Sequence, residues 1–180
     1  MKSVEDVGRR VYEGVIFDVH IQEVERDDGS MAVVETVACS DAVRVYPVTA
    51  SGEVVLLDEW RAELRRRVLR VVAGRIEQGE SPEAGARREL EEELGLSARR
   101  LIPFATSRPM IKVRHTVHHV FAADMFAVAA HPEPDEDTRP RKVPVAGIEP
   151  LVWGGEILED VIALNLLRLR NLLTEGVLKP

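Results

Sequence analysis

The sequence predicts an α/β fold, and three features of the chain support this prediction. Residues that favour β-strands dominate the first half. A helix with clear start and stop signals follows at residues 81–95. Strand-like runs then return before a leucine-rich helix near the end of the chain. Because 180 residues, of which 45% are hydrophobic, can bury a core of their own, we expect one compact unit.

Two β-hairpins are predicted in the first half. Each pairs two runs of strand-favouring residues across a short turn-like sequence. The first turn is Asp-Asp-Gly-Ser at residues 27–30, and the second is Ala-Ser-Gly-Glu at residues 50–53. The four runs are residues 11–24, 31–38, 43–49 and 54–60. The first half should therefore be mainly antiparallel.

The helix at residues 81–95 is predicted from its boundary residues and its apolar spacing. Ser81 can cap the first amides, Pro82 suits the first turn, and Gly95 suits the left-handed end. Apolar residues that recur every four positions should pack the helix onto a sheet. These residues are Ala86, Leu90 and Leu94.

The second half is predicted to hold two more strands, a loop and a final helix. Strands are expected at residues 100–105 and 112–123. Residues 131–142 are rich in proline and charge, which is typical of a mobile loop. Residues 156–175 are expected to form a helix that ends at Gly176. Its leucines should serve the core or a dimer contact and not a membrane anchor.

Charge and composition argue against several classes of protein. A net charge of −7 is unfavourable for a general nucleic-acid binder, which needs a basic surface. No apolar run approaches the roughly 20 residues that cross a bilayer, so we expect a cytoplasmic protein with no membrane partner. Cys39 is the only cysteine, which excludes an intrachain disulfide and a cysteine-based zinc cluster. We expect it to be a small buried residue.

A cluster of acidic residues in the predicted helix points to metal chemistry. Glu89, Glu92 and Glu93 lie within about one turn, and Glu89 and Glu93 are side by side because they are four residues apart. Like charges at this spacing repel each other. A divalent cation such as Mg²⁺ would turn this repulsion into coordination, and it would also bind phosphate oxygens of a substrate.

The alternative is a solvated helix face on which arginines pair with glutamates four residues on, Arg87 with Glu91 and Arg88 with Glu92. The surrounding residues favour the metal site, because residues 74–96 resemble the Nudix box, Gly-x5-Glu-x7-Arg-Glu-U-x-Glu-Glu-x-Gly-U with U aliphatic. Such a match should arise by chance well below about once in a million positions. Every specified position is occupied, by Gly74, Glu80, Arg88, Glu89, Leu90, Glu92, Glu93, Gly95 and Leu96.

The resemblance implies a Nudix α/β/α sandwich with a mixed central sheet. It divides the chain into an N-terminal antiparallel β extension at residues 1–40, expected to make dimer contacts, and a Nudix hydrolase domain at residues 41–180. It also implies a Mg²⁺ site, with Mn²⁺ as the alternative cation. The implied metal ligands are the Ala73 carbonyl, Glu89 and Glu93. Glu92 is implied either as a further metal ligand or as a catalytic base that acts through a metal-bound water. The structural residues of the box are Gly74, Glu80, Arg88 and Gly95, with Glu80 and Arg88 as its internal ion pair.

Other segments are similar to the ADP-ribose and nucleoside-diphosphate-sugar pyrophosphatases within this family. Residues 59–61, Glu-Trp-Arg, stand where that branch often has Gln-aromatic-Arg, and residues 71–74 resemble its Leu-Pro-Ala-Gly or Val-Ala-Gly. Arg61 is therefore a candidate for binding substrate phosphate or sugar, and the alternative is an exposed loop arginine. Residues 107–109, Ser-Arg-Pro, fall near that branch's Ser-Pro-Gly, which makes Pro109 a further substrate-binding candidate.

Two downstream features complete the predicted site. Residues 135–139 resemble the acidic loop that closes over the substrate, and Glu136 is the catalytic candidate, with Glu133 and Asp135 as alternates and a merely charged loop as the other interpretation. The glycine of Ser-Pro-Gly is absent, and basic residues follow where a carboxylate is usual, namely Lys112, Arg114 and His115. Arg114 is therefore a substrate-binding candidate for a more highly phosphorylated or differently shaped ligand. A histidine metal site is not expected, because His118 faces away from His115 and His119 on a strand.

The predicted function is Mg²⁺-dependent hydrolysis of the pyrophosphate bond in a nucleoside diphosphate linked to another group, with ADP-ribose or a nucleotide sugar favoured. One alternative is a dinucleoside polyphosphate or nucleoside triphosphate pyrophosphohydrolase, and another is a Nudix ligand sensor without turnover. A purely structural role would require the carboxylates to be indifferent to Mg²⁺. The expected partners are a small nucleotide and a second copy of the chain, joined through the N-terminal strands.

Overall fold

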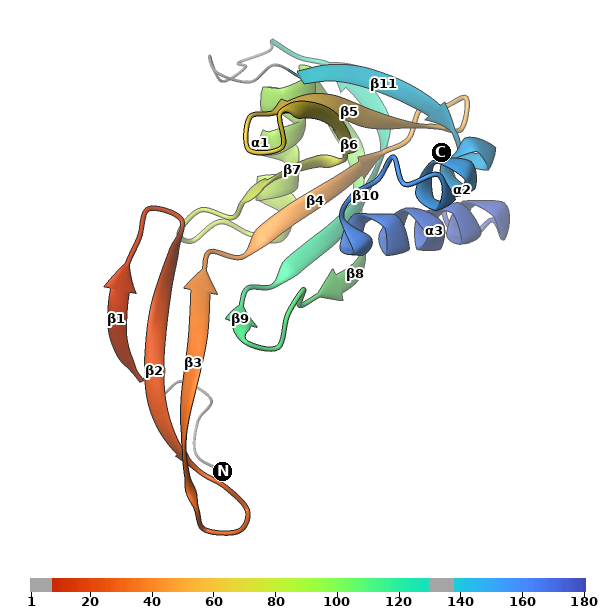
Figure 1. The fold of residues 1–180 in the computed structure, drawn as a ribbon. Coiled ribbons are helices and arrows are strands. Elements are labelled where there is room, and N and C mark those ends of the chain that lie inside the picture. Colours follow the sequence, from red (N-terminus) through yellow and green to blue (C-terminus); the bar gives the residue numbers. More distant parts are fainter. Residues whose placement is uncertain (1–7, 130–137) are drawn as a thin grey trace.

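Three β-sheets and three α-helices make up the computed structural model, which describes residues 8–129 and 138–180 (Figure 1). The strands are β1 (Arg9–Glu13), β2 (Phe17–Glu25), β3 (Met31–Cys39), β4 (Ala42–Pro47), β5 (Glu53–Arg61), β6 (Arg66–Arg70), β7 (Val72–Arg75), β8 (Leu96–Ser107), β9 (Val113–Arg114), β10 (Val117–Ala127) and β11 (Thr138–Pro144). The helices are α1 (Pro82–Leu94), α2 (Ile148–Trp153) and α3 (Asp160–Thr174), and a short 3₁₀ turn at Val145–Gly147 leads into α2.

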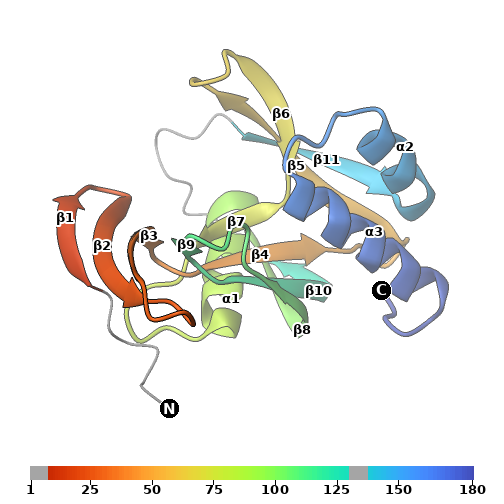
Figure 2. The same ribbon diagram turned by 60° about the horizontal axis from the view of Figure 1, so that its bottom comes forward.

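The central sheet is mixed, as expected for the sandwich. Its strand order is β7-β4-β10-β8, and β4 is parallel to β10 while the two outer pairs are antiparallel. Successive residues of a strand face opposite sides, so Val45 packs with α1 whereas Tyr46 packs with α3. Figure 2 shows the two helices on opposite sides of this sheet. The α/β/α arrangement predicted from the sequence is therefore confirmed.

The N-terminal strands form a separate sheet that extends away from the central one (Figure 1). The predicted turn at residues 27–30 joins β2 to β3, and Asp28 accepts hydrogen bonds from the amide and hydroxyl of Ser30 there. The prediction of one strand over residues 11–24 is wrong, because β1 and β2 are two antiparallel strands. The chain reverses at Gly14, whose amide donates to the Asp18 carboxylate.

The second predicted hairpin is also wrong, although its turn exists. Beyond a single bridge between Val48 and Val54, β4 and β5 separate into different sheets. Both edges of β4 are already paired, since Val45 lies beside Val72 of β7 on one side and Val120 of β10 on the other. β5 therefore pairs with β6 and β11 in a third sheet.

Helix α1 agrees with its prediction in detail. The Ser81 hydroxyl accepts a hydrogen bond from the Ala84 amide, and Gly95 ends the helix in the left-handed conformation with φ of 61°. The apolar residues at four-residue spacing pack against the central sheet, and two of them, Ala86 and Leu90, are fully buried. Local signals were sufficient here because capping and apolar spacing involve only neighbouring residues.

The C-terminal region differs from prediction in three places. Thr138–Pro144, partly within the predicted loop at residues 131–142, is strand β11 on β5, and the preceding residues 130–137 lie outside the described residues. α2 was not predicted, since it is only six residues long and contains Pro150. α3 begins at Asp160 and not at Glu156, because Ile157 forms a β-bridge with Leu69 and keeps that segment extended.

Two smaller observations concern residues singled out in the sequence. Cys39, at the end of β3, is half-buried and not fully buried. Burial and the nearby Asp41 carboxylate raise the pKa of its thiol. Within residues 8–129 and 138–180, no helix combines the length and apolar character needed to cross a membrane.

A buried polar cluster ties α3 to the central sheet. His119 of β10 is fully buried, and its ring nitrogens lie 2.8 Å from the Tyr46 hydroxyl and 2.8 Å from the Ser107 hydroxyl. Asn165 of α3 donates to the same ring at 3.2 Å. Burial, assisted by the positive charge of Arg44, lowers the pKa of His119 from 6.5 to about 4. The fold therefore holds His119 neutral at pH 7.

This depressed pKa predicts a loss of stability in mild acid. The unfolded chain binds a proton near pH 6.5 and the folded chain only near pH 4, so the stabilisation is complete above pH 6.5 and falls as pH drops through this range. The full effect should approach about 3 kcal/mol. Urea unfolding of wild type and His119→Gln at several pH values measures it, and the variant should show the shallower dependence. Parallel curves for the two proteins would contradict this assignment.

Candidate active site

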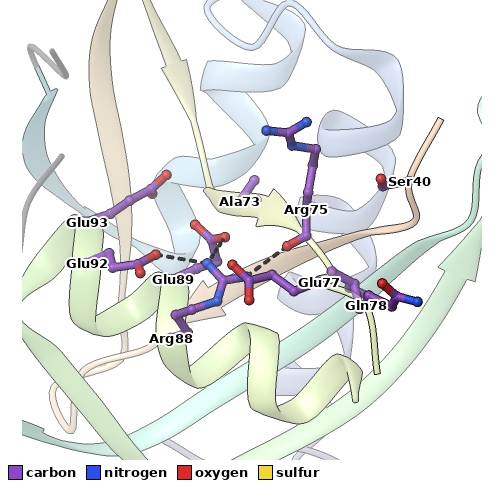
Figure 3. Close-up of a pocket in the computed structure, with 11 residues that line it drawn as sticks. Ser40, Ala73, Arg75, Glu77, Gln78, Arg88, Glu89, Glu92 and Glu93 are labelled. Carbon is purple, nitrogen blue, oxygen red and sulfur yellow. Dashed lines mark hydrogen bonds and ion pairs between the residues drawn. The ribbon is translucent and has the colours of Figure 1, made fainter. Parts of the chain in front are cut away.

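A cavity of about 570 Å³ lies between the backbone of β7 and the acidic face of α1 (Figure 3). Residues from β7, the loop that follows it and α1 form most of its wall, and Ser40 joins them from the end of the N-terminal sheet. The lining residues are Ser40, Ala73, Gly74, Arg75, Ile76, Glu77, Gln78, Arg88, Glu89, Glu92 and Glu93. The structure thus brings most residues of the box to one place.

The close approach of β7 to α1 requires a glycine at position 74. β7 is held in place by β4, where Gly74 pairs with Val43. A Cβ atom added to Gly74 would lie 1.7 Å from Oε1 of Glu89, so any larger residue would displace this carboxylate. Glu89 is buried against the strand as a result. The glycine therefore sets the position of an acidic side chain and not only the path of the backbone.

Arg88 links the loop to the helix through several hydrogen bonds. Its guanidinium donates to both carboxylate oxygens of Glu80, at 3.1 and 3.0 Å, and to the Arg75 carbonyl at 2.8 Å. These bonds to Glu80 raise the pKa of Arg88 and lower the pKa of Glu80. The remaining nitrogen, Nη1, donates to Glu89 at 2.6 Å and to Glu92 at 2.9 Å (Figure 3). Arg88 therefore shares its one positive charge among two of the three helix carboxylates and Glu80.

Arg70, on strand β6, pairs with the third helix carboxylate, Glu93. Its Nη2 donates to Oε1 of Glu93 at 2.5 Å, and its Nε forms an ion pair with Glu59 of β5. Glu59 in turn accepts a hydrogen bond from Arg61 at 3.2 Å. Arg70 was not among the site residues predicted from the sequence. Its position between the core residues Leu69 and Val71 could have indicated a role, because a buried charge requires a partner.

The donor set of this cavity suits a divalent cation. Three carboxylates and the Ala73 carbonyl are hard oxygen ligands of the kind that Mg²⁺ prefers. In the part of the chain that the structure describes, no three acidic, histidine or cysteine side chains are already gathered as a ready metal site. Arg88 contacts both Glu89 and Glu92, so its guanidinium stands where a cation would neutralise the same two carboxylates. The donor atoms of the cavity fit a cation that takes over these contacts of Arg88.

Three other predicted site residues, which belong to flanking segments, do not line this cavity. Arg61 is at the end of β5 and pairs with Glu63, and Pro109 is exposed in the loop after β8. Arg114 lies in β9, where its Nε and Nη2 are buried without a hydrogen-bond partner among the described residues. Glu136 and its alternates, Glu133 and Asp135, fall outside the described residues. The structure thus gathers the helix carboxylates but not Arg61, Pro109 or Arg114 in the wall of this cavity.

Histidines at residues 115–119 have other partners. His115 precedes β10, and its Nδ1 lies 2.6 Å from the Ser40 carbonyl, to which it donates a hydrogen bond. His119 belongs to the buried cluster with Tyr46 and Ser107, where hydrogen bonds satisfy its ring nitrogens. Neither side chain lines the cavity.

The contact between Gly74 and Glu89 predicts that Gly74→Ala is destabilising. The added methyl group must push the Glu89 carboxylate or β7 aside, and overpacking of this kind costs about 1–3 kcal/mol. Gly147→Ala is the control, because a Cβ there meets only side-chain atoms and at longer range, Cγ1 of Val143 at 3.3 Å and Cδ of Pro144 at 3.9 Å. Urea unfolding in the presence of EDTA compares the two variants with wild type. Equal losses in both would show that the contact is unimportant.

Comparison with known proteins agrees with the geometry of the site. A family model described as NUDIX domain matches residues 40–154. The chain is 33% identical, over 141 residues, to an ADP-ribose pyrophosphatase of Bacillus subtilis (strain 168), and the match covers 76% of this chain and 76% of that protein. It is also 33% identical, over 101 residues, to a methanol dehydrogenase activator of Bacillus methanolicus, covering 54% of this chain and 55% of the relative.

A solved structure shares the fold. The crystal structure of an ADP compounds hydrolase superposes with a TM-score of 0.83 over 93% of this chain and 92% of that chain, at 23% sequence identity. This likeness extends to almost the whole length and so includes the sheets on both sides of the cavity. The family match, which spans more than half of the chain, and the box residues gathered in one cavity lead to the same conclusion. The chain belongs to the Nudix family and is a Nudix hydrolase.

Proposed function

We propose that this Nudix hydrolase cleaves the pyrophosphate bond of ADP-ribose or a related nucleotide sugar in a Mg²⁺-dependent reaction. The observation that carries the proposal is the cavity in which Glu89, Glu92 and Glu93 face the backbone of β7. The similarity to a Bacillus ADP-ribose pyrophosphatase favours ADP-ribose among the possible substrates. The products would then be two phosphomonoesters, AMP and ribose 5-phosphate.

The proposed roles follow from the burial of each carboxylate. Glu89 and Glu93, with the Ala73 carbonyl, would hold the cation, because their side chains are only 10% and 3% exposed and cannot reach far from the helix. Glu92 is 31% exposed and could act either as a further ligand or as the base that takes a proton from water. When bound, Mg²⁺ would neutralise the pyrophosphate oxygens and lower the pKa of a coordinated water. Mn²⁺ is the alternative cation.

The flanking candidates keep their roles as proposals. We propose that Arg61, Arg114 and Pro109 bind substrate and that Glu136 is a catalytic residue of the acidic loop. Arg114 has the strongest structural support, since two of its buried nitrogens lack a partner among the described residues and could meet an anion. The proposed structural roles are supported by the Glu80–Arg88 ion pair, by the close approach of Gly74 to Glu89 and by the position of Gly95 at the end of α1. A reducing compartment such as the cytoplasm suits the single cysteine.

We also propose that two copies associate through the N-terminal sheet. Four exposed apolar residues lie on one face of this sheet, namely Tyr12, Phe17, Met31 and Val33. They share this face because side chains alternate between the two faces along each strand, and the strand register places these four on the same side. The rings of Tyr12 and Phe17 lie 6.4 Å apart, which extends the apolar surface across two strands. Glu23, Glu25 and Glu35 lie on the same face, so these apolar residues form a patch within a partly charged surface. An exposed apolar patch of this kind is typical of a protein interface.

Val33→Lys tests this association, because Val33 is 65% exposed on the apolar face. The buried charge should separate the copies, so light scattering at micromolar concentration should give the mass of one 20.1 kDa chain, against twice that for wild type. Val24→Lys places the same charge on the opposite face of the sheet and should stay dimeric. A single-chain mass for the wild type would show that the proposed dimer is wrong.

Glu93→Gln tests the proposed reaction. Phosphomonoester release is measured from ADP-ribose, nucleotide sugars, dinucleoside polyphosphates and nucleoside triphosphates, with Mg²⁺ present or chelated. Turnover of the best compound should require Mg²⁺ and fall on the order of 100-fold or more in the variant, because a metal ligand is lost. Glu91→Gln, a control on the same helix but outside the cavity lining, should retain activity.

The panel also separates the alternatives. Preference for a dinucleoside polyphosphate or a triphosphate would replace the ADP-ribose proposal while leaving the metal chemistry in place. Tight binding of one compound without turnover would instead support a ligand sensor, and the catalytic roles given to Glu92 and Glu136 would then be wrong.

A further inference from the structure

We propose that Arg70 is a positioning residue that holds Glu93 in the orientation needed for binding the cation. This inference rests on the proposed function, since it assigns Glu93 as a ligand. Arg70 is the last residue of β6, and its side chain is only 14% exposed. It does not line the cavity and so acts on the reaction only through Glu93.

The geometry joins Arg70 to two carboxylates on different elements. One nitrogen bonds Glu93 of α1 and another pairs with Glu59 of β5, which is itself only 11% exposed. A planar guanidinium can bond two carboxylates at once in fixed directions, whereas a lysine ammonium is a point charge on a flexible stem. Arg70 is therefore braced by Glu59 on one side and can fix the carboxylate of Glu93 on the other.

Burial makes this contact necessary when no cation is bound. The Glu93 side chain is 3% exposed, so water cannot neutralise its charge. A carboxylate without a compensating partner in such a place would turn away or become protonated. Arg70 supplies the compensating charge at Oε1, and an ionised carboxylate has acceptor lone pairs on both of its oxygens.

The positions of the neighbouring residues show why Arg70 cannot easily move away. Leu69 and Val71 are both buried in the core, and Leu57 of β5 pairs with Arg70 in the sheet register. The guanidinium is thus anchored by backbone pairing, by two core side chains and by Glu59. Partners that orient metal ligands in this way change metal affinity by roughly 10–100-fold when they are lost.

Mn²⁺ binding tests the proposal without requiring turnover. Titration of the folded protein, with free Mn²⁺ measured by its EPR signal, gives the dissociation constant for wild type and for Arg70→Gln. We expect the constant to rise by roughly 10-fold or more in Arg70→Gln. Arg70→Lys, which keeps the charge, should restore part of the affinity, and Glu59→Gln should give an intermediate loss because the brace is weakened.

Arg67→Gln is the matched control. Arg67 lies on the same strand and pairs with Asp58 of β5 at 2.7 Å, so its removal costs a comparable ion pair in the same sheet. Its Mn²⁺ affinity should equal that of wild type. Thermal unfolding in EDTA shows which variants are folded, and if Arg70→Gln is not, the comparison of Arg70→Lys and Glu59→Gln with this control decides the question.

Two results would overturn the proposal, and neither can be confused with failure of the proposed function. Unchanged Mn²⁺ affinity in the Arg70 and Glu59 variants would show that Glu93 is positioned without Arg70. Increased affinity would show that Arg70 competes with the cation for Glu93. If the wild type itself failed to bind Mn²⁺, the metal-dependent function would fail first.

Discussion

Neutralisation of the α1 carboxylates is the constraint on which the rest of the site depends. Glu89, Glu92 and Glu93 share one helix face, and two of them are nearly buried, so their mutual repulsion is only weakly screened by water. Each needs a positive partner in the metal-free protein. Arg88 donates hydrogen bonds to Glu89 and Glu92, and Arg70 donates one to Glu93. These contacts allow three carboxylates to lie on one face of α1 beside β7.

The sheet topology brings a further residue to this charge network. β4 is paired on both edges, so β5 must leave the central sheet and pair with β6. This departure carries Glu59 to the back of the site, where it meets Arg70. Gly74 on β7 allows the strand to approach Glu89 from the front. The carboxylates are therefore enclosed by elements that a simple β4–β5 hairpin could not have supplied.

Sequence reasoning succeeded where the determining contacts are local. The boundaries of α1 follow from Ser81 and Gly95, and the gathering of its glutamates follows from helical spacing. It failed where the choice of partner is distant in the chain. The β5 pairing depends on β4 being occupied already, β6 is too rich in arginine to show a strand pattern, and the contact between Arg70 and Glu93 spans 23 residues. Arg61 and Pro109 were selected by motif position alone, which does not fix where a loop or strand end lies.

Among the described residues, Ser40 links the N-terminal sheet to the cavity. Ser40 directly follows β3 and lines the cavity, and its carbonyl accepts a hydrogen bond from His115, which directly follows β9. β9 is itself paired with β3, so a shift of this sheet would move Ser40 and His115 together. The proposed association of two copies through this sheet would thus act on the rim of the cavity at Ser40. Under the proposed function, α1 together with Arg88 and Arg70 would set where a cation binds, and the N-terminal sheet would reach the nucleotide site through Ser40.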